Sequence, residues 1–555
     1  MLKLATVFSG IGAIEHALKR MGIEHEIVFA SDNGDVDIFK RNIGINFIDI
    51  KNELDRLKNI IKDIDIDIET DYDYLTDLDD HLNKINNRIY ELQSKCEYVD
   101  FNIEYIIDKL SDEKVKKDVN KICSKYDELN KINNIDKILL IQLVEKDNPT
   151  LIKNQSINIM PNIKLVQKEL REIISQLNML NEKIETLNIH SELKKIEDYS
   201  EKKKYIDNLY KDKEKSNFVK KSYFANYDIK DENFHWNVSF IDGRQYTNKV
   251  DLFVGGSPCQ SFSMVGKQRG LSDTRGTLFY EYARLVKEIK PKVFIYENVK
   301  AVLSNDSGKT WKTMSEVFDD LGYNWKLMVL NSKDFGVAQN RERIFVVGFR
   351  SDLILNKEFE EPKKIELIKK MKDYLLDNVS GKYYLNKKGV AFVTDDKNLQ
   401  KKWTQIDGDI QLCQKKNQQF NWHGDFVFEE ENTDKEKTMN DLEKYFLSEK
   451  VRKYVLASGT KNFYSKPEID LDIARPLLTT MHKMHRAGVD NYVTTDGRIR
   501  KLTPRECLRL MGFCDSFKIV VSDTQAYQQA GNSIVVDVLI AIMNEIIKVF
   551  PKILN

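Results

Sequence analysis

The stretch LATVFSGIGAIEHALKRMGIEHEIVFASD, residues 4–32, decides the fold. Its first apolar run, LATVF at 4–8, predicts a buried strand, and SGIGA at 9–13 predicts a tight turn. The next segments, IEHALKRMG at 14–22 and HEIVFASD at 25–32, predict a helix and a second strand. Strand, turn, helix and strand in this order form the first unit of a doubly wound parallel sheet, so we expect an α/β fold.

The same stretch contains residues suited to a nucleoside ligand. Gly10 and Gly12 let the backbone turn tightly and approach a ligand, and the helix that follows begins with free N–H groups. Glycine turns also occur for packing alone, so this signal is weak by itself. Asp32 ends the second strand, where a carboxylate can accept hydrogen bonds from a ribose diol. Together these residues predict a nucleoside cofactor at the carboxyl edge of the sheet.

Residues 51–225 have a different pattern. They contain no glycine, and apolar residues recur at alternating spacings of three and four, the heptad spacing of helices that pack along a narrow seam. The seam positions are Leu75, Leu78, Leu82, Ile85, Ile89, Leu92, Val115, Val119, Ile122, Tyr126, Leu129, Val166, Leu170, Ile173, Leu177, Leu180, Ile184 and Leu187. Two prolines in residues 146–162 interrupt the pattern and indicate a chain reversal. We expect an antiparallel coiled-coil arm or a helical bundle with a mechanical or partner-binding role.

The α/β pattern resumes at about residue 236. It predicts strands at 249–258, 291–299 and 341–349, and helices at 277–290, 503–513 and 532–550. Residues 352–490 are less regular and rich in Lys, Asn, Gln and aromatic residues, so we expect a second, smaller domain there.

Composition and charge narrow the class of protein. The chain has 555 residues, and its 87 Lys and Arg balance its 87 Asp and Glu, so only local basic faces could bind nucleic acid. Its six cysteines form no CxxC pair and lie near no histidine at zinc-ligand spacing, so we expect neither a disulfide framework nor a metal site. No signal peptide or membrane-spanning run is predicted, and a soluble cytoplasmic protein without a membrane partner is expected.

The stretch GGSPCQSFS, residues 255–263, places a cysteine after a predicted strand. Cys259 is therefore expected at the same sheet edge as the cofactor. An isolated cysteine is usually structural, but a thiolate with a lowered pKa in such a setting can act as a nucleophile. The loop that follows contains three glycines with Lys267, Arg269 and Arg275, and it could close over a site and contact phosphates. We therefore favour a catalytic role for Cys259.

Two further segments bring polar side chains to this edge. Glu297 ends a predicted strand, where partial burial would keep its carboxyl protonated and able to donate to a ring nitrogen. Arg341 and Arg343 alternate at the start of another strand, so both are expected on one face, where arginine suits a carbonyl oxygen or a phosphate. A structural salt bridge for Glu297 and a surface ion pair for the arginines are the alternatives.

The ordered motifs FSGIGA, GGSPCQSFS, ENV, QNRER, LTPRECLRLMGF and QAGNSIVVDV resemble those of the DNA cytosine-5 methyltransferases. The resemblance covers about residues 1–50, 236–350 and 493–549. It implies a doubly wound, Rossmann-like methyltransferase domain formed by 1–50, 226–351 and 491–555. A coiled-coil-like helical insertion at 51–225 and a target-recognition domain at 352–490 would interrupt it.

The resemblance also implies a reaction and a cofactor. Cys259 would attack C6 of a cytosine flipped out of double-stranded DNA, and S-adenosyl-L-methionine would methylate C5. Glu297 would hold N3 and the exocyclic amine, and Arg343 would bind the O2 side with support from Arg341. The implied cofactor contacts are Phe8, Ser9, Gly10, Gly12, Asp32, Asp242, Pro258, Asn532 and Ser533. The implied DNA contacts are Gln260, Ser263, Lys267, Arg269, Arg275, His485 and Arg486.

Two departures from the family pattern stand out. Ala13 replaces a glycine that many members have, and the helical segment lies between Asp32 and Asp242, where most members have a short connection. An insertion at such a loop costs little closure entropy, so it need not damage the catalytic domain. The insertion could reach along DNA, bind another protein or mediate self-association.

Three functions remain to be separated. We expect the modification enzyme of a restriction–modification system, with a cognate endonuclease as a candidate partner. A tRNA cytosine-5 methyltransferase is one alternative, but the Cys-Phe-Thr tripeptide of that branch is absent. A non-catalytic DNA-binding or scaffold protein is the other, and the intact set of Cys259, Glu297 and Arg343 argues against it.

Overall fold

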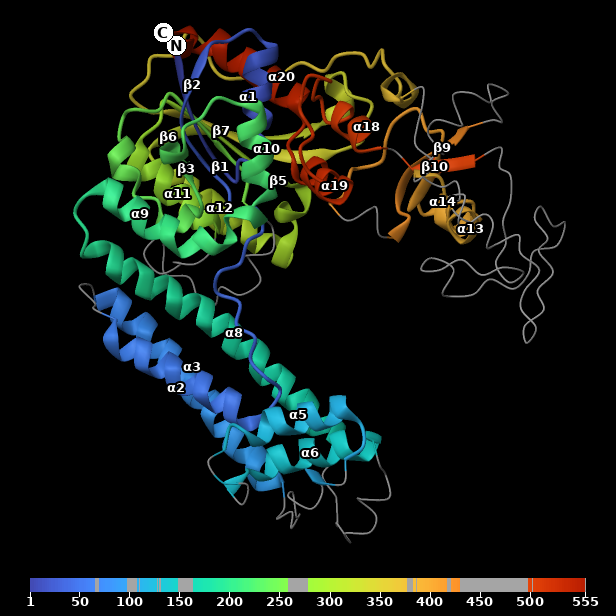
Figure 1. Ribbon diagram of the computed structural model, residues 1–555. Helices are drawn as coiled ribbons and strands as arrows, with labels where there is room; N and C mark the ends of the chain where they lie inside the picture. Colours follow the sequence, from blue (N-terminus) through green and yellow to red (C-terminus); the bar gives the residue numbers. More distant parts are fainter. Residues whose placement is uncertain are drawn as a thin grey trace, which may run out of the picture.

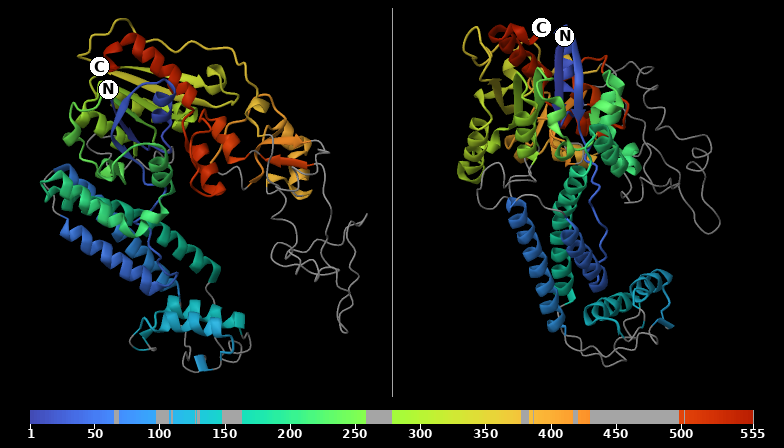
Figure 2. Two further views of the ribbon diagram at one scale, coloured as in Figure 1. Left: turned by 45° about the horizontal axis from the view of Figure 1, so that its top comes forward. Right: turned by 90° about the vertical axis from the view of Figure 1, so that its left-hand side faces the viewer.

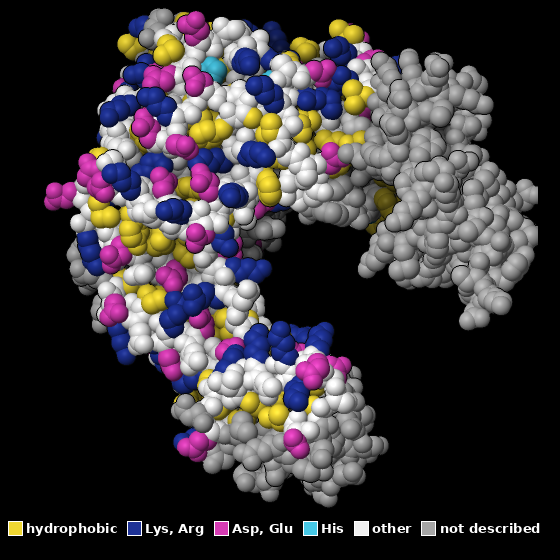
Figure 3. All heavy atoms as spheres, viewed as in Figure 1, with side chains coloured by type: hydrophobic (Ala, Val, Ile, Leu, Met, Phe, Trp, Pro, Cys, Tyr) yellow, Lys and Arg dark blue, Asp and Glu magenta, His cyan; other side chains and the backbone are white. Residues whose placement is uncertain are grey.

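The computed structural model describes residues 1–64, 69–96, 107–108, 110–126, 128, 131–147, 163–257, 278–376, 383–385, 387–416, 421–429, 498–501 and 503–554. Figure 1 shows an α/β unit that contains both chain termini, a helical arm that extends from it, and a small sheet set to one side. In the space-filling view, a broad hollow lies between the α/β unit and the far end of the arm (Figure 3).

The α/β unit is built on a seven-stranded sheet with the order β3-β2-β1-β4-β5-β7-β6. The strands are β1 (Leu2–Val7), β2 (His25–Ser31), β3 (Phe234–His235), β4 (Leu252–Gly255), β5 (Val293–Val299), β6 (Tyr323–Asn331) and β7 (Glu342–Arg350). Strands β1 to β5 are parallel, which confirms the predicted parallel sheet for this part. Strand β7 runs antiparallel to β5 and β6, a pairing that the sequence patterns did not predict.

Helices cover both faces of this sheet, because successive residues of its buried strands point to opposite sides. Helices α1 (Ala13–Arg20) and α20 (Val536–Val549) share one core with Leu4 and Val254. Helices α11 (Leu278–Ile289) and α12 (Lys309–Asp319) share the other with Phe253. The parallel strands thus end at one edge between two helical layers (Figure 2).

The C-terminal part returns to this unit through α18 (Pro504–Arg509), α19 (Asp523–Asn532) and α20. Thr503 caps α18 with a capping box to Glu506, as the Thr-Pro start predicted. The predicted helix at 532–550 begins only at Val536, because the chain is extended at Ser533 and Val535. The stretch Asp523–Val549 is apolar and long enough to cross a membrane by composition, but 56% of its most apolar window is buried inside the protein.

The helical arm comprises residues 47–194, and its long helices pack lengthwise. These are α2 (Phe47–Asp63), α3 (Glu69–Lys95) and α8 (Ile163–Lys194), with α5 (Glu113–Cys123) and α6 (Asn134–Asp147) at the far end (Figures 1 and 2). The seam residues of α3 and α8 lie in one shared core, with Leu187 at its partly buried border. The seam residue Leu129 lies outside the described residues. Three long helices with a common core form a bundle.

The helices that follow the arm pack against the sheet instead. Helix α9 (Tyr199–Tyr210) ends with Tyr210 stacked on Trp236, at 4.9 Å between ring centroids. Helix α10 (Phe218–Asn226) buries Tyr223 against Phe234 of β3. The packing therefore divides the helices near residue 195, whereas the predicted boundary was residue 225.

The smaller sheet has the order β10-β9-β8. Its strands are β8 (Thr404–Ile406), β9 (Gly424–Glu429) and β10 (Arg498–Lys501), and the short helices α13 (Lys387–Val393) and α14 (Asp396–Gln400) precede them. Strand β9 pairs parallel with β8 and antiparallel with β10. Strands β8 and β9 lie within residues 352–490, the region expected to form a smaller domain, and β10 lies just beyond it.

Candidate cofactor and catalytic site

The glycine turn after β1 lies at the carboxyl end of the sheet. Gly10 and Gly12 have φ angles of +55° and +77°, which side-chain-bearing residues rarely adopt. No described atom lies within 4 Å of the position that a Cβ would take at Gly10, so the backbone there borders open space. Phe8 also has a positive φ of 52°, an uncommon conformation that clusters at ligand sites. This turn fits the close approach of a nucleoside cofactor.

Asp32 joins this turn to the end of β2. Its carboxylate accepts hydrogen bonds from the Gly10 N–H at 2.9 Å and the Gly34 N–H at 2.8 Å. Burial raises the pKa of Asp32, and the two N–H groups act in the opposite direction. Ser9 completes the link, because its hydroxyl donates to the Ser31 carbonyl at 3.2 Å. The structure thus brings the predicted cofactor residues of the first two strands together.

Helix α10 holds the same loops, a role that the sequence analysis missed. The Asn217 amide donates to the Asp32 carbonyl at 3.0 Å, and its oxygen caps α10 by accepting from the Lys220 N–H at 2.8 Å. The Tyr227 hydroxyl donates to the Gly12 carbonyl at 2.6 Å. A Cβ at Gly12 would lie 2.2 Å from the Tyr227 ring, so glycine is required there. These contacts join residues more than 180 positions apart in the sequence, which no local pattern reveals.

We expect Asn217→Ala to weaken cofactor binding by up to about 30-fold, because a cap and a loop hydrogen bond are lost together and each is typically worth about 1 kcal/mol. The measurement is the dissociation constant of S-adenosyl-L-methionine by calorimetry, beside a thermal melt. Asn226→Ala is the matched control, since Asn226 lies in the same helix and donates to the Lys518 carbonyl at 3.0 Å. Equal weakening by both variants would contradict a specific role for Asn217.

Asp242 lies apart from these loops and is already paired. It caps the short helix Gly243–Tyr246, and its carboxylate contacts Lys202 of α9 at 3.0 Å and Arg244 at 2.6 Å. Burial raises the pKa of Asp242, but the two cations outweigh it and lower the pKa to about 2. A narrow pocket beside it is lined by α9 and by Trp236 and Asp242. A contact between Asp242 and the adenine stays a prediction, and Lys202 is a neighbour that the sequence did not indicate.

The end of β4 meets the end of β5 at the centre of the edge. A Cβ at Gly256 would lie 2.9 Å from the Glu297 Oε2 atom, so only glycine lets this carboxyl approach the backbone. Glu297 is 14% exposed, and burial raises its pKa against the opposing effect of Arg343 and Arg341. The segment that begins two residues later lies outside the described residues. It contains Pro258, Cys259, Gln260, Ser263, Lys267, Arg269 and Arg275.

Asn298 anchors the last described residues before that segment. Its amide donates to the Ser257 carbonyl at 3.2 Å and to the Tyr296 hydroxyl at 2.8 Å. The Tyr296 hydroxyl also bonds the Ser257 hydroxyl at 2.7 Å. The carbonyl and the hydroxyl of Ser257 are therefore both hydrogen-bonded to side chains of β5.

The two arginines share a face, as predicted, but have different partners. The Arg343 Nε atom lies 3.2 Å from the Glu297 Oε1 atom, while Arg341 is buried and donates to backbone carbonyls. Those carbonyls belong to Gln414 at 2.9 Å, Gly531 at 3.1 Å and Ser533 at 3.0 Å. Both guanidinium groups lie 3.9 Å from the Cys413 Sγ atom. Arg343 thus faces the carboxyl, and Arg341 joins three chain segments behind it.

Asn532 and Ser533 lie where α19 gives way to α20. Asn532 is exposed, and Ser533 is buried with its hydroxyl donating to the Ile534 carbonyl at 3.1 Å. The neighbouring Gly531 packs on the backbone of Lys416, 2.6 Å from where a Cβ would lie. Arg341 connects this segment to the catalytic edge. The predicted DNA-binding residues His485 and Arg486 lie outside the described residues.

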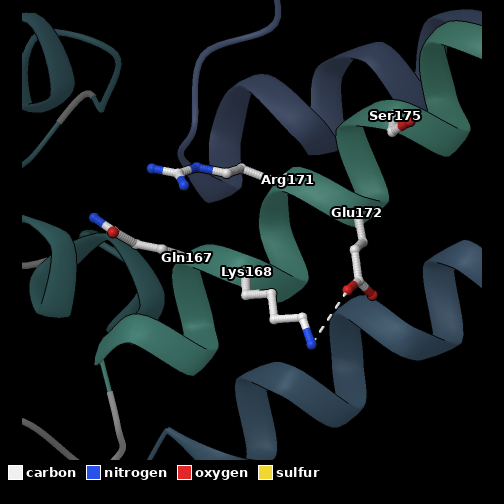
Figure 4. A pocket seen from close by; sticks show the side chains of 5 residues that line it. All are labelled: Gln167, Lys168, Arg171, Glu172 and Ser175. Atoms are coloured by element: carbon white, nitrogen blue, oxygen red, sulfur yellow. Dashed lines mark ion pairs between the residues drawn. The ribbon is translucent and has the colours of Figure 1, made fainter. Parts of the chain in front are cut away.

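A second surface hollow lies away from this edge. This hollow of about 350 Å³ lies on α8 and is lined by Gln167, Lys168, Arg171, Glu172 and Ser175. Figure 4 shows Lys168 and Glu172 pointing toward each other, 3.9 Å apart, while Arg171 points away from them. No residue of the sheet edge lines this hollow. The site is therefore defined by the converging strand ends.

Comparison with known proteins identifies the class. Residues 200–548 match the family model described as C-5 cytosine-specific DNA methylase. The orphan methyltransferase M.SPRI of Bacillus phage SPR is 31% identical over 400 residues, covering 60% of this chain and 90% of that protein. The type II methyltransferase M.HhaI of Haemophilus parahaemolyticus is 35% identical over 289 residues, covering 52% of this chain and 73% of that protein. The type II methyltransferase M1.ScrFI of Lactococcus lactis subsp. cremoris is 32% identical over 336 residues, covering 60% and 71%.

The chain belongs to the C-5 cytosine-specific DNA methylase family. It is accordingly a DNA cytosine-5 methyltransferase, and its methyl donor is S-adenosyl-L-methionine. The predicted family, enzyme class and cofactor are confirmed. The individual site residues stay predictions, and the geometry above is what supports or separates them.

Proposed function

We propose that this chain methylates C5 of a cytosine flipped out of a specific double-stranded DNA sequence, with Cys259 as the nucleophile. The observation that carries the proposal is the contact between Gly256 and the Glu297 carboxyl. Cys259 follows Gly256 by three residues, and three residues of chain span at most about 10 Å. Connectivity therefore keeps the thiol within reach of a base that Glu297 and Arg343 hold.

The roles of the three side chains follow from their chemistry. The Cys259 thiolate adds to C6 of the cytosine, and the electron pair of the C5–C6 double bond is released to C5 and, by conjugation, toward N3, so that C5 becomes the nucleophile that receives the methyl group. Glu297, whose pKa is raised by burial, holds a proton at N3 and so stabilises the ring that forms. Arg343 lies beside that carboxyl and can donate to O2 of the base. Loss of the C5 proton and of the thiol then restores the aromatic ring.

The cofactor would bind at the glycine turn after β1. S-adenosyl-L-methionine supplies the electrophilic methyl group that C5 receives. Phe8, Ser9, Gly10 and Gly12 would line it, and Asp32 would hold its ribose while keeping its two backbone hydrogen bonds. The remaining proposed contacts are Asp242, Pro258, Asn532 and Ser533. Arg341 is a positioning residue here, because its two terminal nitrogens donate to the carbonyls of residues 414, 531 and 533, while its buried Nε has no hydrogen-bond partner among the described residues.

DNA recognition is proposed for the region around the smaller sheet. Residues 352–490 occupy the place of a target-recognition domain, and its lysines and aromatic residues suit phosphate and base-edge contacts. The proposed DNA contacts are Gln260, Ser263, Lys267, Arg269, Arg275, His485 and Arg486. The other domain assignments stand as proposed, and the core that the arm helices share, from Ile50 to Ile184, supports treating the arm as a separate unit.

We further propose that the enzyme acts in a restriction–modification system, in the cytoplasm and on the host DNA. Two of the relatives named above are type II methyltransferases, which supports this assignment. A cognate restriction endonuclease would be the partner. Methylated DNA would then resist cleavage by that endonuclease.

One reaction tests the proposed function. Purified protein, methyl-labelled S-adenosyl-L-methionine and unmodified plasmid are incubated, and the protected cytosines are mapped by bisulfite sequencing. Label on C5 of cytosine within one recurring sequence is the expected result. Label on adenine, label only on tRNA in a parallel reaction, or no transfer at all would overturn it.

A further inference from the structure

Helix α5, at the far end of the arm, presents a row of lysines. Lys114, Lys117 and Lys121 are exposed and follow the spacing of one helix face, while Val119 and Cys123 on the opposite side are buried. Among the described residues, no carboxylate lies within 4.0 Å of these three ammonium groups. Lys125, one turn further on, does pair with Asp49. The three lysines, called the α5 lysine row below, are available to an external anion.

Helix α5 lies at the far end of the arm, which borders the hollow between the arm and the α/β unit (Figures 1 and 3). The arm leaves the sheet directly after Asp32, at the carboxyl edge that carries Gly10 and Glu297. In Figure 3, Lys and Arg side chains gather along the border of α5 that adjoins the hollow between the arm and the α/β unit. A long polyanion that extends from the site across this hollow would therefore come close to α5.

We propose that the α5 lysine row binds phosphate groups of the same DNA duplex, beyond the target sequence. This inference rests on the proposed function, because the duplex is the substrate of the catalytic edge. Lysine suits this role, since it contacts phosphate as a point charge without reading bases. The contacts therefore add affinity for flanking DNA of any sequence.

The length of α8 sets where this contact falls. Helix α8 has 32 residues, so it spans about 48 Å at 1.5 Å per residue. Helices α5 and α6 pack against each other and α6 packs on α8, at the arm's far end (Figure 1). At roughly 3.4 Å per base pair, that distance corresponds to about 14 base pairs of duplex. For a duplex that runs alongside the arm, DNA much shorter than this beyond the target is not expected to reach the α5 lysine row.

Binding to two duplexes tests the proposal. One duplex has 6 base pairs on each side of the target, and the other has 25. The variant Lys114→Gln/Lys117→Gln/Lys121→Gln should bind the long duplex about tenfold more weakly than the wild type and bind the short one equally well. Three lost phosphate contacts should also reduce the salt slope of log K on the long duplex by roughly 2.7.

A matched variant removes the same charge elsewhere. Lys211→Gln/Lys213→Gln/Lys215→Gln changes three exposed lysines in the short helix Lys211–Ser216, between α9 and α10. This control should keep the wild-type affinity for both duplexes. Equal methylation of the short duplex by all three proteins shows that each variant is folded.

The outcomes distinguish this inference from the proposed function. If the wild type methylates neither duplex, the proposed function fails. If it methylates both but the lysine variant binds the long duplex as the wild type does, the α5 inference alone is overturned. A change in sedimentation of the DNA-free protein, with no length-dependent loss of DNA binding, would also overturn it, because the row would then serve a second copy of the chain.

Discussion

Replacing Cys259 with alanine should abolish methyl transfer while leaving DNA binding intact. The proposed reaction runs through a bond between the thiol and C6, and loss of a covalent nucleophile typically lowers turnover by roughly 10⁴-fold or more. The remaining groups at the edge, Glu297 and Arg343, still offer a carboxyl and a guanidinium to the flipped base. Single-turnover transfer of labelled methyl groups measures the loss, and gel-shift titration measures binding.

The matched control for this experiment is Cys514→Ala. Cys514 is exposed and lies outside the catalytic edge, so its removal should leave turnover within about twofold of the wild type. A fluorinated cytosine at C5 of the target should trap wild-type protein on the DNA, since the C5 proton can no longer leave. Trapping of the Cys259→Ala protein would show that another group forms the covalent bond.

Replacing Glu297 with glutamine should lower kcat by roughly 10²- to 10⁴-fold, the usual contribution of a positioned acid. Glutamine keeps the shape of the side chain and its hydrogen bonds, so the affinity for DNA should change little. The wild type needs the protonated carboxyl. Its activity should therefore fall as the pH rises through the Glu297 pKa, which burial has raised. The glutamine variant should lack that descending limb, because glutamine does not titrate.

Glu342→Gln provides the comparison for Glu297. Glu342 begins β7 at the same edge of the sheet and pairs with Lys300 at 3.0 Å, but it is largely exposed. Its replacement should preserve both turnover and the pH profile. If Glu297→Gln retained the descending limb, the titrating group would be another residue, and the role assigned to Glu297 would be wrong.

Local patterns predicted the parts of the fold that depend on local sequence. The β1–α1–β2 unit was predictable because buried strands, a glycine turn and an amphipathic helix each leave a short-range signature. The heptad residues of α3 and α8 were found for the same reason. Strand β6 was missed, because its burial pattern is irregular and its order beside β7 is set by pairing between distant segments. The predicted start of α20 was four residues early, since nothing in that apolar run marks the extended backbone at Ser533.

The site was predictable to the extent that its residues lie at strand ends. Asp32, Glu297 and Arg343 follow or begin strands, and parallel strands bring their carboxyl ends to one edge. The residues that hold them were not predictable. Asn217 and Tyr227 act across long sequence separations, and Arg341 donates to carbonyls of distant segments whereas Arg343 pairs with Glu297. Such partners depend on tertiary packing, which composition and spacing do not encode.

The helices up to residue 194 belong to the arm, and those that follow pack against the sheet. This boundary determines how the arm could be exchanged between enzymes. The chain departs after β2 and returns at β3, and Ala30 of one strand pairs with Phe234 of the other, so both ends of the excursion are neighbours in the sheet. A graft that replaced residues 47–194 would leave α10 in place, together with its hold on Asp32 and Gly12. A cut at residue 225 would take Asn217 away with the arm. An exchange of the arm between enzymes, natural or engineered, would therefore keep the cofactor loops intact if the chain were joined near residue 195, before α10 begins.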